Sequence, residues 1–164
     1  MPRIEIVRIV RAPRARLFDL ARSVDAHLAS TPGTHERVVG GKTSGLLGLG
    51  EEVTWEARHL GVTQRLTSRI TRFERPHHFR DSMVKGAFAR FDHDHVFEPV
   101  PGDGASTRCL DVFDFDAPLG PLGRIAERVF LERYMRRFLE VRMDVLEELA
   151  TGDGWERFVG DGRA

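Results

Sequence analysis

The chain has 164 residues, of which 41% are hydrophobic and 30% charged, as expected of one globular domain with a substantial core. Its 25 basic and 25 acidic residues give a formal net charge of zero, which argues against the basic footprint of most nucleic-acid-binding proteins. The single cysteine, Cys109, excludes a disulfide within the chain. No run approaches the roughly 18 apolar residues of a membrane span, and the N-terminus lacks a signal-peptide core. We therefore expect a soluble, cytoplasmic protein that binds no nucleic acid and does not insert stably into a membrane.

The first 30 residues predict a strand followed by two short helices. Residues 3–10 are rich in β-branched side chains and partly alternate, which is typical of a strand. Pro13 then stands where a helix tolerates proline, in its first turn, and residues 14–22 place apolar side chains at helical spacing. We expect a second short helix over residues 24–29, because the Ser-Thr-Pro-Gly run at 30–33 is a strong stop signal.

From residue 35 to about residue 116 the pattern becomes that of strands joined by short turns, which predicts an antiparallel sheet. Strands are expected over residues 35–39, 51–59, 62–73, 79–84, 88–97 and 106–115. The strand over residues 62–73 would be about 40 Å long at roughly 3.3 Å per residue, so the sheet must twist or curl strongly. The glycine-rich segment 44–50 is expected to form a mobile loop at the entrance of the fold.

The last predicted element is a long amphipathic helix over residues 122–149. Its apolar stripe comprises Ile125, Val129, Phe130, Tyr134, Phe138, Val141, Val145 and Leu149. Since an antiparallel sheet must cover its buried face, this helix is the only element long enough to do so. The sequence therefore predicts an α+β fold in which a curled antiparallel sheet of about seven strands wraps around a C-terminal helix. The domain is expected over residues 1–150, with a flexible tail over residues 151–164.

A curled sheet wrapped around one helix leaves internal space unless large side chains fill it. Apolar and aromatic residues would line that space with a few polar ones among them, which is the composition of a small-molecule pocket. A fully packed core is the alternative that the sequence leaves open. The predicted lining residues are Trp55, His59, Gln64, Leu66, Ile70, Met83, Phe91, Phe113, Tyr134 and Phe138.

Four short segments carry a family resemblance: APRARLFDL at residues 12–20, FRDSMVKGAF at 79–88, HDHVF at 93–97 and DVFDFDAPLG at 111–120. Together with the element order, they resemble the helix-grip fold of the START, polyketide cyclase and birch-pollen-allergen superfamily, often called SRPBCC. The details are similar to its bacterial cyclase-like, ligand-binding branch. The resemblance covers residue 3 to about residue 150. It is strong for the fold and weak for the activity, because the fold hosts several functions.

Members of that superfamily carry lipids, sterols, quinones, plant hormones or polyketides, and a minority catalyse cyclisation or dehydration. The resemblance therefore implies that the chain binds or transports a hydrophobic molecule of lipid, quinone, polyketide or aromatic type, as a monomer or homodimer and without a cofactor. A cyclase or dehydratase is the alternative function. A protein-interaction module that uses an exposed sheet edge or helix is a third and weaker possibility.

The most distinctive polar residues are His93 and His95, which stand one residue apart on a predicted strand. Both side chains then share one face with Phe91, and the same alternation turns Asp81 and Asp111 inward from neighbouring strands. The four groups are candidates for a structural hydrogen-bonded network, for orienting a hydroxyl or carbonyl of an apolar guest, or for acid–base catalysis. A His-x-His pair near a carboxylate can also hold zinc, but the superfamily is not known for metals, so none is expected.

Overall fold

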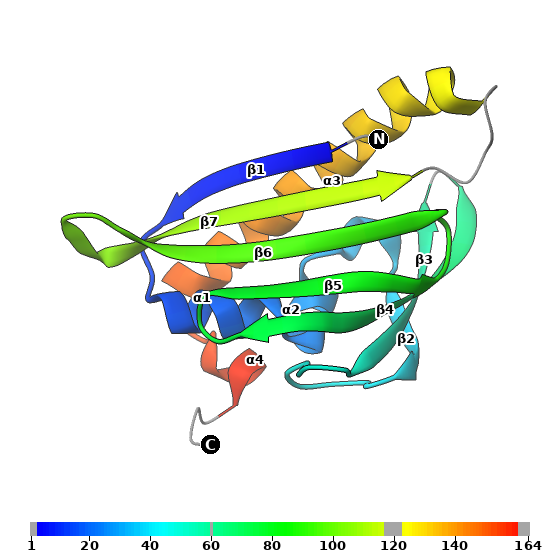
Figure 1. The fold of residues 1–164 in the computed structure, drawn as a ribbon. Helices are drawn as coiled ribbons and strands as arrows, with labels where there is room; N and C mark the ends of the chain where they lie inside the picture. Colours follow the sequence, from blue (N-terminus) through cyan, green and yellow to red (C-terminus); the bar gives the residue numbers. More distant parts are fainter. Residues whose placement is uncertain (1–2, 60, 117–122, 161–164) are drawn as a thin grey trace.

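The computed structural model describes residues 3–59, 61–116 and 123–160, with all side chains among these except those of Pro32 and residues 123–129. Seven strands form one antiparallel sheet in the order β1-β7-β6-β5-β4-β3-β2 (Figure 1). They are β1 (Arg3–Val10), β2 (Arg37–Gly41), β3 (Glu52–His59), β4 (Val62–Glu74), β5 (His78–Lys85), β6 (Arg90–Val100) and β7 (Asp103–Asp116). The first two strands of the sequence form the opposite edges of the sheet, so the chain crosses the molecule between them.

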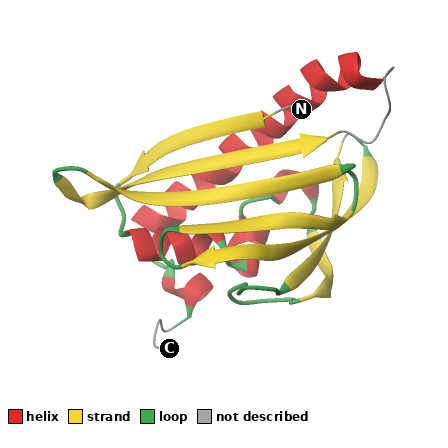
Figure 2. Ribbon diagram, in the orientation of Figure 1, coloured by secondary structure: helices red, strands yellow, loops and turns green. Residues whose placement is uncertain are grey.

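The helices gather on one face of the sheet, where α3 runs behind β1, β7 and β6 (Figure 2). They are α1 (Arg14–Ala21), α2 (Val24–Ala29), α3 (Gly123–Thr151) and α4 (Glu156–Val159), together with a single 3-10 turn, η1 (Pro32–Thr34). The predicted α+β fold, a curled sheet around a long C-terminal helix, is therefore confirmed. The predicted strand at residues 35–39 begins later, at Arg37, because His35 adopts a left-handed backbone with φ 50°.

Strand β6 shows how the sheet separates its two faces. Every second residue from position 91 to position 97 is buried: Phe91, His93, His95 and Phe97. The residues between them lie on the outer face, where the Arg80 side chain donates two hydrogen bonds to the Asp94 carboxylate, at 2.8 and 2.7 Å. The period-2 alternation of a strand thus places both histidines in the interior and the acidic residues outside.

One end of the interior, which we call the filled end, is packed by α1, α2, α4 and the C-terminal part of α3. The Phe18 ring of α1 meets the rings of Phe73, Phe79 and Phe97 edge-on, with centroids 5.4, 5.3 and 5.8 Å away. Such edge-to-face contacts are the favourable arrangement for aromatic pairs. The buried members of the filled end are Val10, Ala12, Leu17, Phe18, Leu20, Val24, Ala26, Leu47, Val53, Trp55, Ile70, Phe79, Phe97, Cys109, Met143 and Ala150.

The other end, which we call the hollow end, lies under the N-terminal half of α3. Its buried members come from β1, β6, β7 and α3: Ile4, Ile6, Phe91, Phe113, Phe115, Met135 and Leu139. Partly buried side chains pack against them: Leu66, Met83, Phe88, Leu131, Tyr134 and Phe138. Among the described side chains, α1, α2 and α4 contribute none to this cluster. Long strands therefore extend beyond the helices that pack the filled end, and α3 covers the remainder.

The glycine-rich segment 44–50 lies against the filled end. The Val24 N–H donates to the Gly45 carbonyl at 3.0 Å, and the Gly45 N–H donates to Asp25 Oδ2 at 2.8 Å. Leu47 is a buried member of the filled end. The prediction of an entrance at this loop is therefore wrong, since the segment docks on α2 and lines no part of the cavity described below.

Part of the predicted flexible tail packs on the domain. Trp155, Phe158 and Val159, at and within α4, pack against the filled end. The Ser23 hydroxyl donates a hydrogen bond to the Phe158 carbonyl at 2.8 Å. The packed domain thus extends beyond the predicted boundary at residue 150, as far as α4, while residues 161–164 lie outside the described part of the chain.

Candidate functional site

An internal cavity of about 510 Å³ lies mainly at the hollow end, between the sheet and α3. Most of its wall is apolar or aromatic: Trp55, Ala57, Leu66, Ala87, Phe88, Phe91, Phe113, Phe130, Leu131, Tyr134, Met135, Phe138 and Leu139. A smaller set of polar side chains completes it: His27, Glu36, His59, Gln64, Ser68, Asp81, His93 and Arg142. A concave, largely apolar site of this size with a few convergent polar groups is typical of a small-molecule pocket.

Most of the predicted pocket residues line this cavity: Trp55, His59, Gln64, Leu66, Phe91, Phe113, Tyr134 and Phe138. Ile70 and Met83 do not. Ile70 points inward as expected, but it belongs to the filled end. Met83 packs against the hollow end without reaching the cavity surface. It lies beside a β-bulge, because Thr67 pairs with Lys85 while the next residue, Ser68, pairs with Met83. The alternation correctly predicts that both side chains lie on the inner face of the sheet. Whether each one lines the cavity depends on its position along the strand and, for Met83, on the bulge.

The cavity reaches solvent beside the N-terminal part of α3. Phe130, predicted on the buried stripe of the helix, is 60% exposed and also lines the cavity, so it meets both solvent and the interior. One turn further on, Tyr134 Oη and His59 Nδ1 share a hydrogen bond of 2.7 Å. The Phe138 ring meets His59 edge-on at 5.5 Å. The side chains of Ile125 and Val129, also predicted on that stripe, lie outside those described.

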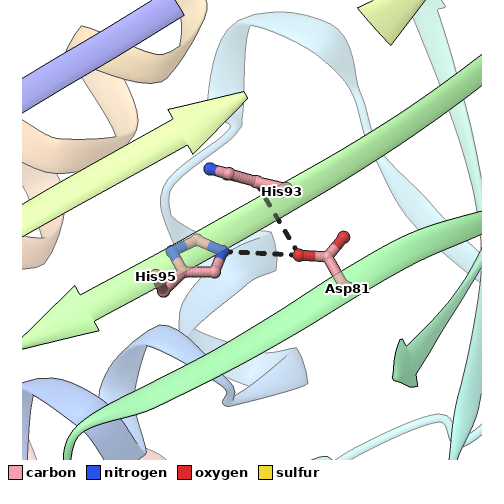
Figure 3. Close-up of side chains that lie close together, drawn as sticks. All are labelled: Asp81, His93 and His95. Carbon is pink, nitrogen blue, oxygen red and sulfur yellow. Dashed lines mark ion pairs between the residues drawn. The ribbon is translucent and has the colours of Figure 1, made fainter. Parts of the chain in front are cut away.

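The structure brings Asp81, His93, His95 and Asp111 together on three adjacent strands, β5, β6 and β7; Figure 3 shows the first three. In the sheet register Asp81 stands opposite His93, and His95 stands opposite Asp111. His95 donates its Nδ1–H to Asp111 Oδ1 at 2.9 Å, and its Nε2 lies 3.4 Å from Asp81 Oδ1. His93 Nδ1 lies 3.8 Å from Asp81 Oδ1, and His93 Nε2 lies 3.7 Å from Asp111 Oδ2. Each histidine thus lies between the two carboxylates.

These contacts separate the pKa values of the two histidines. Burial opposes the charge of His95, but the attraction and hydrogen bond of Asp111, assisted by Asp81, raise its pKa to about 9. For His93, burial and then the nearby charge of His95 lower the pKa. Burial also opposes the charge of Asp111, yet the two histidines hold its pKa far below the ordinary value. At neutral pH the cluster therefore holds a charged His95 beside a neutral His93.

Only part of this cluster faces the cavity. Asp81 and His93 line it, whereas His95 and Asp111 border a void of about 20 Å³ behind them. The His95 ring stacks on Phe79 of the filled end, with centroids 4.4 Å apart. Asp81 and His93 can therefore touch a guest directly, while the candidates His95 and Asp111 act on it only through them.

A second group of polar side chains lines the cavity and was not predicted. His27 of α2 stacks on Trp55 with centroids 4.0 Å apart, and its Nε2 lies 3.1 Å from Glu36 Oε2. Despite the burial of Glu36, the neighbouring His27, with Arg142, lowers the pKa of its carboxyl to about 2. The six-residue α2 is too short to show a period, and Glu36 directly follows the left-handed His35.

Arg142 could have been found from the sequence. It stands four residues after Phe138 and seven after Met135, so it falls on the inward stripe of α3. Its Nε is buried and has no hydrogen-bond partner among the described residues. Burying a polar atom without a hydrogen bond costs folding free energy, unless a bound molecule or water supplies the missing partner.

A curled antiparallel sheet closed over a cavity by a long C-terminal helix defines the helix-grip architecture. The chain belongs to the family described as polyketide cyclase / dehydrase and lipid transport, whose model matches residues 1–151. The resemblance to the START and polyketide cyclase superfamily is thereby confirmed. No curated protein matches the chain. None of the helices among the described residues is long and apolar enough to cross a membrane.

Solved structures show the same fold at low sequence identity. A protein from Thermus thermophilus has a TM-score of 0.71 at 21% identity, with 90% of this chain and 95% of that chain covered. The Zhui aromatase/cyclase from a Streptomyces species has a TM-score of 0.71 at 15% identity, with 99% of both chains covered. A START superfamily protein from Mycobacterium smegmatis has a TM-score of 0.67 at 11% identity, covering 90% of this chain and 96% of that one.

Proposed function

We propose that this protein binds or carries a hydrophobic small molecule in the cavity at its hollow end. The observation that carries the proposal is the cavity itself, about 510 Å³ with a mostly aromatic and aliphatic wall. Protein interiors are otherwise close-packed, and side chains that border an empty space lose dispersion contacts. A guest that fills the space restores these contacts and stabilises the folded chain. The family description, which includes lipid transport, supports the same function.

The polar side chains of the wall favour a guest that is apolar over most of its surface and carries a few oxygen atoms. His59 of β3 shares a hydrogen bond with the Tyr134 hydroxyl, Gln64 lies on β4, and Asp81 and His93 lie on β5 and β6. Hydroxyl and carbonyl groups pair with such side chains, which fix the orientation of the guest. Lipids, quinones, polyketides and aromatic molecules meet this description.

Native mass spectrometry of the purified protein, followed by extraction of any bound molecule, tests the proposal. We expect a discrete apolar adduct that is released when the protein is denatured. If none co-purifies, 1-naphthol and decanoic acid serve as probes, and each should raise the melting temperature. The absence of both an adduct and a thermal shift would contradict the proposal.

A matched pair of variants shows whether the cavity is the binding place. Ala57 is buried, lies on β3 and lines the cavity, so Ala57→Phe places a ring in the space for the guest. Ala105 is exposed on β7 and lies away from the cavity, so Ala105→Phe adds the same ring outside. We expect Ala57→Phe to weaken probe binding at least tenfold, about 1.4 kcal/mol, and Ala105→Phe to bind as the wild type does. Equal binding by both variants would place the probe elsewhere.

A cyclase or dehydratase activity is a second candidate, favoured by the Asp81–His93 face of the cavity. A neutral His93 on the cavity wall provides a proton acceptor, and the charged His95 behind it is a proton donor that reaches a guest only through Asp81 or His93. The fold shared with a Streptomyces aromatase/cyclase agrees with this candidate.

Turnover of a synthetic poly-β-ketone tests the second candidate. We expect a bell-shaped pH profile, and His93→Gln should lower kcat by a factor on the order of 10²–10⁴. His78→Gln is the control, because His78 pairs with Asp94 on the outer face of the sheet. A wild-type protein that binds the compound and leaves it unchanged would exclude this activity on it.

A further inference from the structure

Three side chains of the cluster converge on one point, which the binding of an apolar guest does not explain. One ligand atom from each of Asp81, His93 and His95 lies within 4.8 Å of the other two. Both histidines face the same oxygen, Asp81 Oδ1, from 3.8 Å at His93 Nδ1 and 3.4 Å at His95 Nε2 (Figure 3). These separations exceed the roughly 2.7–2.9 Å of a charge-assisted hydrogen bond. They are close to the spacing across a metal ion, because ligand atoms about 2.0–2.1 Å from a tetrahedral Zn²⁺ lie about 3.4 Å apart.

The Asp111 carboxylate lies on the far side of both rings and is hydrogen-bonded to that of His95. His95 Nδ1 donates to Asp111 Oδ1 at 2.9 Å, and His93 Nε2 lies 3.7 Å from Asp111 Oδ2. A metal-bound histidine almost always presents its second nitrogen to a carboxylate or carbonyl, which fixes the tautomer and the ring orientation. Asp111 does this for His95, whereas the 3.7 Å between its Oδ2 and His93 Nε2 is too long for a hydrogen bond.

His93 also lacks a partner of its own. Its side chain is buried, and its Nε2 has no hydrogen-bond partner among the described residues. Nδ1 faces Asp81 at 3.8 Å, too far for a hydrogen bond. A neutral imidazole that turns a lone pair toward a carboxylate is unfavourable, and a cation between the two atoms converts that contact into an attraction.

We propose that Asp81, His93 and His95 bind a divalent transition-metal ion of the Zn²⁺ type, with Asp111 orienting His95. Two imidazole nitrogens and one carboxylate oxygen form a donor set that suits Zn²⁺ or Co²⁺ and does not suit Mg²⁺ or Ca²⁺. Binding of the ion displaces the proton of His95, and the carboxylates of Asp81 and Asp111 then supply two negative charges, which balance the ion. The superfamily resemblance gives no expectation of a metal, so this site is an addition to it.

The proposed ion borders the cavity, because Asp81 and His93 line it. Three protein ligands leave a fourth position open in a tetrahedral site. A water molecule or an oxygen atom of a guest completes the coordination there. The ion would therefore fix the polar end of a guest whose apolar part occupies the hollow end.

Zn²⁺ binding to the chelator-treated protein, in competition with a chromophoric chelator, tests the proposal without any organic guest. We expect a single ion per chain in the wild type. Asp81→Asn, which keeps the shape of the side chain, and His93→Gln should each weaken binding at least tenfold. Asp111→Asn should weaken it by roughly 10–100-fold, as expected of a residue that orients metal ligands. His78→Gln removes a histidine from the outer face of the same sheet and should leave binding unchanged.

Co²⁺ gives a second measurement that does not depend on the variants folding. Co²⁺ in the proposed site should show the intense visible absorption of four-coordinate cobalt, while adventitious ions on surface histidines give weak octahedral bands. No binding to the wild type, or equal binding by the wild type, Asp81→Asn and His93→Gln, would overturn the proposal. Binding of 1-naphthol is measured separately, in the presence of a chelator and therefore without metal. A failure of the metal proposal then leaves the cavity proposal intact, and a failure of the cavity proposal leaves the metal proposal intact.

Discussion

The two ends of the interior are built from the same sheet and the same long helix, yet one is packed and the other contains a cavity. At the filled end, α1 inserts Phe18 among three other phenylalanine rings. At the hollow end α3 is the only helix with described side chains in the packed cluster, α2 adds only His27 to the cavity wall, and about 510 Å³ remains between the sheet and α3. The difference lies in which helices reach each end, because both ends are rich in aromatic residues. The cavity thus lies where α1 and α4 contribute no described side chain and α2 contributes only His27.

Asp19 near the filled end and the side chains around the cavity differ in how their polar atoms are satisfied. Near the filled end, the Asp19 carboxylate accepts hydrogen bonds from Arg22 at 2.7 and 2.8 Å and from Arg75 at 2.6 and 3.1 Å. Around the cavity, His93 Nε2 and Arg142 Nε are buried without a hydrogen-bond partner among the described residues. Arg16 Nε of α1, at the filled end, is also buried without a partner among the described residues. Because buried polar groups normally find partners, the Arg142 side chain, which lines the cavity, is positioned for a polar group of a guest.

Substitution of two methionines on α3 tests the contrast in packing, and here we expect the largest change in the free energy of unfolding. Met143 is buried in the filled end at 2% exposure, and Met135 is buried in the hollow end at 8% exposure. Met143→Ala leaves a new hole among packed neighbours and should lower the free energy of unfolding by about 2–5 kcal/mol. Met135→Ala enlarges an existing cavity and should cost about 1 kcal/mol, because fewer contacts are lost. Urea denaturation of both variants measures the difference, and equal losses would contradict the contrast.

The ion pairs of Asp19 give an intermediate effect that depends on pH. Burial opposes the charge of Asp19, but the hydrogen bonds from Arg75 and Arg22 outweigh it and lower the pKa below its ordinary value of 3.8. Stability from a lowered pKa is present above the unfolded-state value and is lost as the pH falls through the folded-state value. Asp19→Asn should therefore destabilise the protein by about 1–3 kcal/mol at pH 7. The gap to the wild type should shrink below pH 4, and a constant gap from pH 7 to pH 3 would refute this account.

The reactivity of the Cys109 thiol shows whether the filled end opens without global unfolding. Of the three tests, this one has the smallest expected effect, because the folded protein should not react. Cys109 is fully buried, and burial, together with the nearby Asp111 and Glu147, raises the pKa of the thiol to about 12. The reactive species is the thiolate, so the folded protein should not react with a disulfide reagent at pH 8. In denaturant the thiol should react fully. Rapid reaction in buffer would mean that the filled end is loosely packed.

The fold was predictable because its signals are long and periodic. The alternation on β6 placed His93 and His95 inward, and the same alternation on β5 and β7 brought Asp81 and Asp111 to them. Position along a strand carries no such signal. Ile70 has the correct face and lies at the filled end, because the packing of α1, α2 and α4 decides which end is hollow.

Short elements account for most of what sequence reasoning missed. The six residues of α2 do not reveal which way His27 points, and the left-handed His35 interrupts the alternation before Glu36. The segment 44–50 looked like an entrance because of its glycines, but its contacts with α2 depend on a fold not visible in local sequence. Arg142 is the exception, since a charged residue on an apolar helical stripe is a signal that sequence alone provides.

The central claim, that a guest binds at the hollow end, is tested most directly by methyl NMR of methionine. Helix α3 places Met135 in the hollow end and Met143 in the filled end. The chain is labelled at the methionine methyl groups and titrated with 1-naphthol. We predict that the Met135 signal shifts and saturates while the Met143 signal stays in place, since Met135 lines the cavity and Met143 lies in the filled end. The absence of any shift at Met135, or equal shifts at Met135 and Met143, would contradict a binding cavity at the hollow end.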